Sequence, residues 1–151
     1  VTLKVVGTGP VEQELKFLAQ QAGGRIEFLG YRTGKELHNL VRESRAVVLP
    51  SEWYENAPMS ILESYALGKP VIGARIGGIP EMVVEGETGW TFESKQVNEL
   101  ANRLELVMCA DDIVVENMGM AGREYLKETF SRQRYVDSIL TLYGELGVKK
   151  Q

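Results

Sequence analysis

The sequence has 151 residues, of which 44% are hydrophobic and 25% are charged, and this composition is typical of a single globular domain. The formal net charge of −4 argues against a nucleic-acid-binding surface, since phosphate backbones are bound by dense lysine and arginine. No apolar run approaches the ~20 residues that a membrane-spanning helix needs. The single cysteine, Cys109, excludes an internal disulfide and suits a reducing cytosol, so we expect a cytoplasmic protein.

Short apolar runs alternate with helical stripes through the first part of the chain. The runs predict strands, which we place at Val1–Gly7, Ile26–Leu29, Ala46–Leu49, Val71–Ala74 and Thr91–Phe92. The helices between them are predicted from Pro10 to Ala22, around Lys35–Glu43, and from Pro58 to Gly68. We expect the first strand to be buried and Ala46–Leu49 to be covered on both faces, because these runs contain no polar alternation. Gly77–Pro80 is predicted to form a turn.

From Lys95 onward the pattern is helical. Three apolar stripes are expected, from Val97 to Met108, from Val114 to Tyr125 and from Tyr135 to Leu146. Strands that alternate with helices imply parallel pairing, so the predicted fold class is α/β: one Rossmann-like domain over residues 1–151, with a parallel sheet flanked by helices and a helical C-terminal end. Because Val1 opens directly on a strand, we expect the domain to belong to a longer protein.

The loop between Pro50 and Pro58 has the richest chemistry. In an open parallel sheet, ligands bind outside the carboxyl ends of the strands, and this loop follows such an end. It carries Ser51, Glu52, Glu55 and Asn56 just before a helix whose N-terminal N–H groups and partial positive charge suit a diphosphate.

Two glutamates flank the start of this helix. Glu55 precedes it, and Glu63 lies inside it, roughly 7–8 Å along the axis from Pro58 at ~1.5 Å per residue. Carboxylates do not bind phosphate but accept hydrogen bonds from neutral hydroxyls. Two hydroxyl-bearing rings on either side of a diphosphate describe a nucleotide sugar. Without further motifs, solvated charges around a helix start are the favoured interpretation of these two residues.

Further motifs make the pattern specific. The stretch Pro50–Gly73 (PSEWYENAPMSILESYALGKPVIG), followed by Gly77–Glu81 (GGIPE) and Gly86–Gly89 (GETG), resembles the family-4 retaining glycosyltransferases of GT-B fold. Glu55 and Glu63 match the Glu-x7-Glu motif of that family. The resemblance extends from about Val1 to Phe92, and the C-terminal helices resemble the family only in being helices.

The resemblance implies a role for each matching position. Glu55 is expected to hold hydroxyls of the donor sugar, as the catalytic residue, and Glu63 to hold the ribose hydroxyls. Gly30 and Tyr31 are expected to line the base pocket, although Tyr31 is explained equally well by packing at its rim. The backbone amides expected to face the sugar and the diphosphate belong to Asn56, Ala57, Met59, Ser60 and Ile61.

The resemblance also implies an activity: retaining, hexosyltransferase-like transfer from a nucleoside-diphosphate sugar, with no bound metal and no further cofactor. No cluster of His, Cys or carboxylate residues has the spacing of a metal site, in agreement with that expectation. The acceptor, a glycan, lipid or small molecule, is expected to bind an N-terminal domain that this sequence lacks. Any peripheral contact with the inner face of the membrane is expected through that same domain.

The sequence departs from the family in two ways. Asn56-Ala57-Pro58 replaces the frequent Gly-Phe-Gly, and Pro58 has no N–H to donate. The basic residues that clamp the diphosphate in the family lie on a strand–loop–helix unit that comes before the equivalent of Val1. We therefore expect the isolated chain to bind a nucleoside diphosphate weakly and to be inactive.

Two other functions stay open. A nucleotide-sugar-binding module without transfer activity fits the same residues. An NAD-dependent oxidoreductase is disfavoured, because Glu12 stands where the third glycine of G-x-G-x-x-G belongs. Gly77 and Gly78 are expected to serve turn geometry before ligand contact. The sequence does not identify the nucleotide, the sugar or the acceptor.

Overall fold

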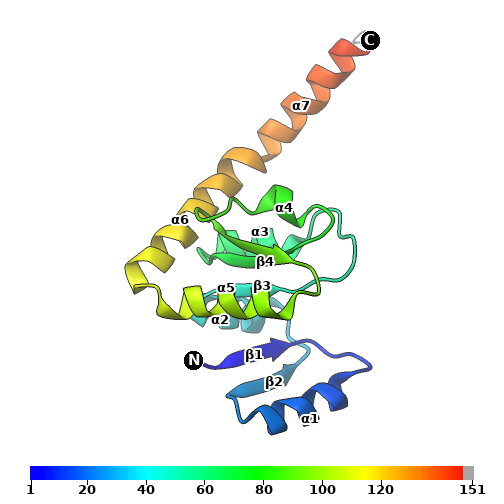
Figure 1. Ribbon diagram of the computed structural model, residues 1–151. Helices are drawn as coiled ribbons and strands as arrows, with labels where there is room; N and C mark the ends of the chain where they lie inside the picture. The colour runs from blue at the N-terminus through cyan, green and yellow to red at the C-terminus, as the bar shows by residue number, and fades with distance from the viewer. Residues whose placement is uncertain (148–151) are drawn as a thin grey trace. The chain divides into compact units, whose positions relative to one another are not determined.

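The computed structural model describes residues 1–147, and the chain divides into two compact units, residues 1–40 and the residues from 41 onward. Figure 1 shows the helices and strands of both units. Strands and helices alternate up to β5, and every strand pairing is parallel. The predicted α/β class with parallel strands flanked by helices is therefore confirmed. The strands form two sheets, ordered β1-β2 and β3-β4-β5.

The first unit contains a two-stranded sheet. Its elements are β1 (Leu3–Val6), α1 (Glu12–Ala22), β2 (Ile26–Gly30) and most of α2 (Gly34–Glu43). The helix α1 ends at Gly23 in the left-handed conformation (φ 63°), but it begins two residues after Pro10, which lies in the preceding turn. The prediction of a buried first strand is wrong, since Leu3 is 45% and Val6 37% exposed. Two strands alone leave much of their surface open to solvent.

The second unit is built around β4. Here β3 (Val47–Leu49), β4 (Val71–Arg75) and β5 (Gly89–Glu93) form a sheet with β4 in the centre. Successive residues of β4 face opposite sides of the sheet, and both sides are buried, as expected of a central parallel strand. The edge strand β3 is only half-buried, so the prediction that Ala46–Leu49 is covered on both faces is wrong.

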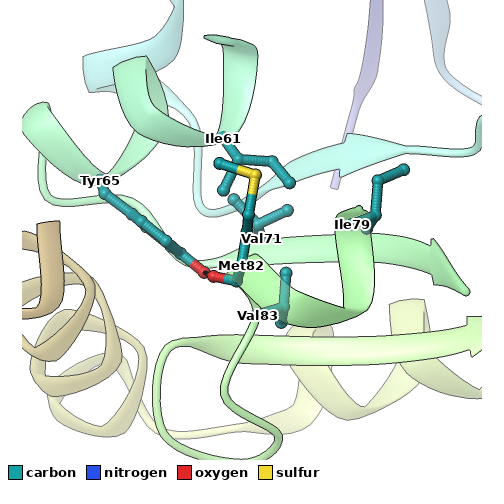
Figure 2. Packing of buried hydrophobic residues seen from close by; sticks show 6 residues of the cluster. All are labelled: Ile61, Tyr65, Val71, Ile79, Met82 and Val83. Atoms are coloured by element: carbon teal, nitrogen blue, oxygen red, sulfur yellow. Dashed lines mark hydrogen bonds between the residues drawn. The ribbon is translucent and has the colours of Figure 1, made fainter. Parts of the chain in front are cut away.

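Different helices cover the two faces of this sheet. Val71 faces α3 (Met59–Ala66) and α4 (Ile79–Met82), whereas Ile72 and Ala74 face α5 (Val97–Cys109). The residues that converge on the α3 side are drawn in Figure 2: Ile61, Tyr65, Val71, Ile79, Met82 and Val83. The helix α4 occupies part of the segment predicted as a turn. It comes close to the sheet because Gly73 has no Cβ, which would lie 2.6 Å from Ile79 Cγ2.

Tyr65 joins α3 to the connection between β4 and β5. Its side chain is completely buried, its hydroxyl donates to the Met82 carbonyl at 3.0 Å, and it lies 2.7 Å from Thr88 Oγ1. Burial raises the pKa of Tyr65 to about 12, against a smaller lowering by the Thr88 hydroxyl. The phenol therefore stays neutral at physiological pH and acts as a structural hydrogen-bonding group at the C-terminal end of α3.

The helix α6 (Asp112–Thr129) packs against α3 through glycines. A Cβ on Gly119 would lie 1.9 Å from the Gly68 carbonyl oxygen, and one on Gly122 would lie 2.5 Å from the Tyr65 ring. The buried stripe of α6 is displaced by one residue from its predicted start, since Val115 is 6% exposed and Val114 45% exposed.

The predicted third C-terminal helix is α7 (Arg132–Glu145), which begins at an N-cap formed by Ser131. It contains no buried residue, and Tyr135 and Leu142 of its apolar stripe are 69% and 47% exposed. The amphipathic pattern therefore predicted the helix correctly, but its apolar side is not packed within residues 1–147. None of the described helices has the length and apolar character required to cross a membrane.

We predict that Gly119→Ala destabilises the protein by about 1–3 kcal/mol or more, because the added methyl meets a carbonyl oxygen that cannot turn aside. The matched control is Gly144→Ala in α7, where a Cβ meets nothing within 4 Å. That change should stabilise the helix by about 0.5–1 kcal/mol. Urea unfolding of the two variants measures both effects, and losses of similar size in both would contradict the packing described for α6.

Candidate functional site

Three connections meet at the carboxyl end of the sheet β3-β4-β5. They are the loop from Pro50 to Pro58, the turn after β4 at 76–78, and the turn after β5 at 94–96. Because the strands are parallel, these connections leave the sheet at the same edge. Hydrogen bonds tie the first connection to each of the other two.

The turn after β4 supports the main chain of Glu55 and Asn56. Gly78 N–H donates to the Glu55 carbonyl at 2.7 Å. A Cβ on Gly77 would lie 2.3 Å from the Glu55 carbonyl oxygen, and one on Gly78 would lie 1.9 Å from that of Asn56. Gly77 has a positive φ of 57°, as expected for this turn, whereas Gly78 has a φ of −84° and does not need glycine for its backbone conformation. The structure adds a requirement that the sequence did not indicate: the glycines make room for the loop that carries Glu55.

The carboxylate of Glu55 is held by a side chain from its own loop. Ser51 Oγ donates to Glu55 Oε1 at 2.6 Å, and both residues are half-buried. The Ser51 carbonyl in turn accepts a hydrogen bond from Ser94 Oγ at 3.0 Å. Glu55 Oε2 accepts no hydrogen bond from the described part of the chain. One carboxylate oxygen is therefore fixed and the other is available to a ligand.

The helix that follows begins at Met59, with Pro58 as its N-cap, and no side chain caps it. The first N–H groups of a helix have no partner inside it. Within residues 1–147, Met59 and Ser60 find no backbone acceptor, whereas Ile61 N–H donates to the Pro58 carbonyl at 3.1 Å. Ile61, whose side chain is 1% exposed, stays a predicted ligand-facing amide, and its N–H already has this acceptor in the structure. Asn56 and Ala57 are exposed on the preceding loop.

The other predicted residues lie further away along the chain. Glu63 is exposed on α3, and its carboxylate contacts no described partner. It lies about 6 Å along the axis from Met59, at ~1.5 Å per residue. Gly30 (φ 68°) ends β2, and Tyr31, 71% exposed, follows it. These two residues belong to the unit of residues 1–40, whereas the glutamates belong to the other unit.

Among the described residues, no metal-binding cluster lies at the loop from Pro50 to Pro58. Residues 1–147 hold no group of three or more His, Cys, Asp or Glu side chains placed to bind a metal ion. The thiol of Cys109 is free and exposed at the end of α5. The chemistry that the loop offers is an uncapped helix N-terminus beside a held carboxylate, which suits a diphosphate joined to a hydroxyl-rich ring.

Comparisons with known proteins agree on one family. The family profile described as glycosyl transferases group 1 matches residues 1–125. N-acetyl-alpha-D-glucosaminyl L-malate synthase from Bacillus anthracis is 32% identical over 148 residues, which cover 95% of this chain and 37% of that protein. This chain thus spans well under half of the length of that relative.

Solved structures agree with the sequence comparison. The Anabaena protein HepE in complex with UDP-glucose superimposes with a TM-score of 0.75 at 26% identity, covering 93% of this chain and 41% of that one. The C-terminal domain of the group 1 glycosyl transferase LpcC from Francisella tularensis has the same TM-score of 0.75 and 26% identity, covering 87% of this chain and 71% of that one.

Proposed function

The chain belongs to the glycosyl transferases group 1 family and has the fold of the C-terminal domain of GT-B glycosyltransferases, and we propose that it binds the nucleotide-sugar donor within a longer, retaining glycosyltransferase. The observation that carries this proposal is the pairing of the Glu55 carboxylate with the uncapped start of α3. The HepE structure supports the choice of donor, because that relative holds UDP-glucose.

In this proposal the diphosphate lies at the N-terminus of α3. The N–H groups of Met59 and Ser60, together with those of Asn56 and Ala57, donate to its oxygens, and the helix dipole adds a partial positive charge. These groups stabilise the negative charge that grows on the diphosphate as the bond to the sugar breaks, which is a task that a metal ion performs elsewhere. We therefore propose transfer without a bound metal or a further cofactor.

The two glutamates hold the rings on either side. Glu55 accepts hydrogen bonds from hydroxyls of the donor sugar, and Glu63 accepts them from the ribose. The bond from the sugar to the diphosphate breaks, the acceptor oxygen bonds to the same sugar carbon on the same face, and the acceptor proton passes to the leaving diphosphate. Gly30 and Tyr31 are proposed to line the pocket for the base.

The proposed longer protein supplies what this chain does not contain. Among the described residues, β1 pairs with β2 alone and β3 pairs with β4 alone. Each of these strands therefore has one free edge, to which a further strand can pair. We propose that a preceding strand–loop–helix unit brings the basic clamp, and that an N-terminal domain brings the acceptor. A nucleotide-sugar-binding module without transfer activity is the alternative. The cytoplasmic location, or the inner face of the membrane, stays a prediction from the sequence.

A ligand panel tests the proposal. The isolated chain is expected to be stabilised by at least one of UDP, GDP and ADP, by about 2.7 kcal/mol at a hundredfold excess over Kd. NAD should have no effect, and the isolated chain should transfer no sugar, since it lacks the clamp and the acceptor domain. Thermal unfolding measures the binding and a product assay measures the transfer. Stabilisation by NAD alone would favour the oxidoreductase, and transfer by the chain alone would refute the need for a second domain.

Glu63→Ala is predicted to weaken nucleotide binding by roughly 1.5–3 kcal/mol, the range for a hydrogen bond to a charged group. The wild-type protein should lose affinity for the 2′-deoxy nucleotide, whereas the variant should lose little more. Titration calorimetry with both nucleotides measures this coupling. Glu105→Ala, which removes an exposed glutamate from α5, is the matched control and should leave both affinities unchanged. Equal losses in the wild type and in Glu63→Ala would show that Glu63 does not contact the ribose.

Glu55→Gln is predicted to slow transfer by about 100-fold or more in the full-length transferase, while the affinity for the free nucleotide stays nearly unchanged. Glutamine has the size of glutamate but no negative charge, so it accepts weaker hydrogen bonds from the sugar hydroxyls in the transition state, where charge develops on the sugar. Steady-state kinetics gives kcat, and calorimetry gives the nucleotide affinity of the same variant. If the nucleotide affinity fell as far as kcat, Glu55 would act on the nucleotide and not on the sugar.

A further inference from the structure

A short hydrogen bond from within the protein, and not from the nucleotide sugar, fixes the carboxylate of Glu55. Ser51 Oγ lies 2.6 Å from Glu55 Oε1 across four residues of the loop. Hydroxyl-to-carboxylate bonds of this length are charge-assisted and stronger than bonds between neutral groups. A free glutamate side chain samples several rotamers, and this bond restricts Glu55 to those that keep Oε1 beside the hydroxyl.

Ser51 is itself held from a second connection. Ser94 Oγ donates to the Ser51 carbonyl at 3.0 Å, from the residue that follows β5. The next residue, Lys95, has a φ of 68° and is the only non-glycine residue with a positive φ among residues 1–147. A lysine in the left-handed region is strained, so surrounding contacts must maintain the turn. Its ion pair with Glu52 at 3.6 Å is exposed and adds little.

The chain of contacts runs from the end of β5 to the proposed catalytic carboxylate. Ser94 holds the main chain of Ser51, and Ser51 holds Glu55 Oε1. Gly78 holds the Glu55 carbonyl from a third side. The main chain and one carboxylate oxygen of Glu55 are thus fixed before any ligand binds, and Oε2 is left to accept from the ligand.

We propose that Ser51 is a positioning residue for sugar transfer, which acts through Glu55 and is supported by Ser94. This inference rests on the proposed role of Glu55 toward the donor sugar. Preorganising a group that acts in the transition state raises kcat, whereas it does little for a nucleotide that the group does not touch. Ser51 therefore affects turnover and leaves the affinity for free nucleoside diphosphate unchanged.

The test uses the full-length transferase with Ser51→Ala, Ser51→Thr and the matched control Ser44→Ala. Ser44 is also half-buried, but its hydroxyl donates to the Val41 carbonyl of its own segment at 2.8 Å. Ser51→Ala is expected to lower kcat by about tenfold, as for the loss of a hydrogen bond to a charged group, with an unchanged affinity for UDP, GDP or ADP. Ser51→Thr keeps the hydroxyl and should restore most of kcat, and Ser44→Ala should change neither quantity. A parallel fall of kcat and nucleotide affinity in Ser51→Ala would overturn the inference.

The double variant Ser51→Ala/Glu55→Gln separates this inference from the proposed function. If Ser51 acts through Glu55, the serine substitution adds less than about twofold to the loss already caused by Glu55→Gln. Two losses that multiply would overturn the inference while leaving the role of Glu55 in place. Normal transfer by Glu55→Gln alone would instead overturn the proposed role of Glu55, whatever Ser51→Ala does. Ser94→Ala, one contact further away, is expected to lower kcat by a smaller factor than Ser51→Ala.

Discussion

The candidate site depends on how closely two stretches of main chain approach each other. Gly78 donates to the Glu55 carbonyl at 2.7 Å, and any Cβ at 77 or 78 would overlap the backbone of Glu55 or Asn56. Only glycine permits this approach, and it brings the connections after β3 and β4 into one rigid edge. The carboxylate, the uncapped helix start and the exposed amides take their positions from that contact.

The position of α3 must also be fixed, because the N–H groups of its first turn can face a ligand only if the axis of the helix does not move. Tyr65 holds the opposite end of the helix, where its hydroxyl binds the Met82 carbonyl and lies beside Thr88. The helix α6 lies directly on Gly68 and on the ring of Tyr65, because its residues at these contacts, Gly119 and Gly122, have no side chain. The C-terminal end of α3 is therefore buried and tightly packed, while the N–H groups of Met59 and Ser60 at its other end have no backbone acceptor among the described residues.

Much of this arrangement could be predicted from the sequence, because it depends on local signals. The apolar runs placed the strands, and Pro58 with the following apolar period placed the start of α3, so Glu55 lies before the helix and Glu63 inside it. What could not be predicted depends on contacts distant in sequence. Ser94 lies 43 residues from Ser51, and nothing in its surroundings indicates that it will bind that carbonyl.

The sequence also does not show which residues a glycine contacts, or which of two adjacent apolar residues is buried. A glycine gives no sign of which backbone it will face, so the contacts of Gly78 and Gly119 cannot be predicted from the sequence. Val114 and Val115 fit a helical stripe equally well, and only the packing of α6 selects Val115. The exposure of β1 also does not follow from the sequence, because an apolar run predicts burial without indicating how many strands pair with it.

The contacts that hold the loop from Pro50 to Pro58 come from Ser51, Glu55, Ser94 and Gly78, and this has a consequence for its evolution. Asn56 and Ala57 are both exposed, and they lie between Glu55, whose carbonyl accepts a hydrogen bond from Gly78 N–H, and the buried Pro58. Under the proposed function, substitutions at these two positions change the surface offered to the donor without changing the contacts that hold the loop. Under that proposal, divergence in donor choice is separated from divergence in architecture.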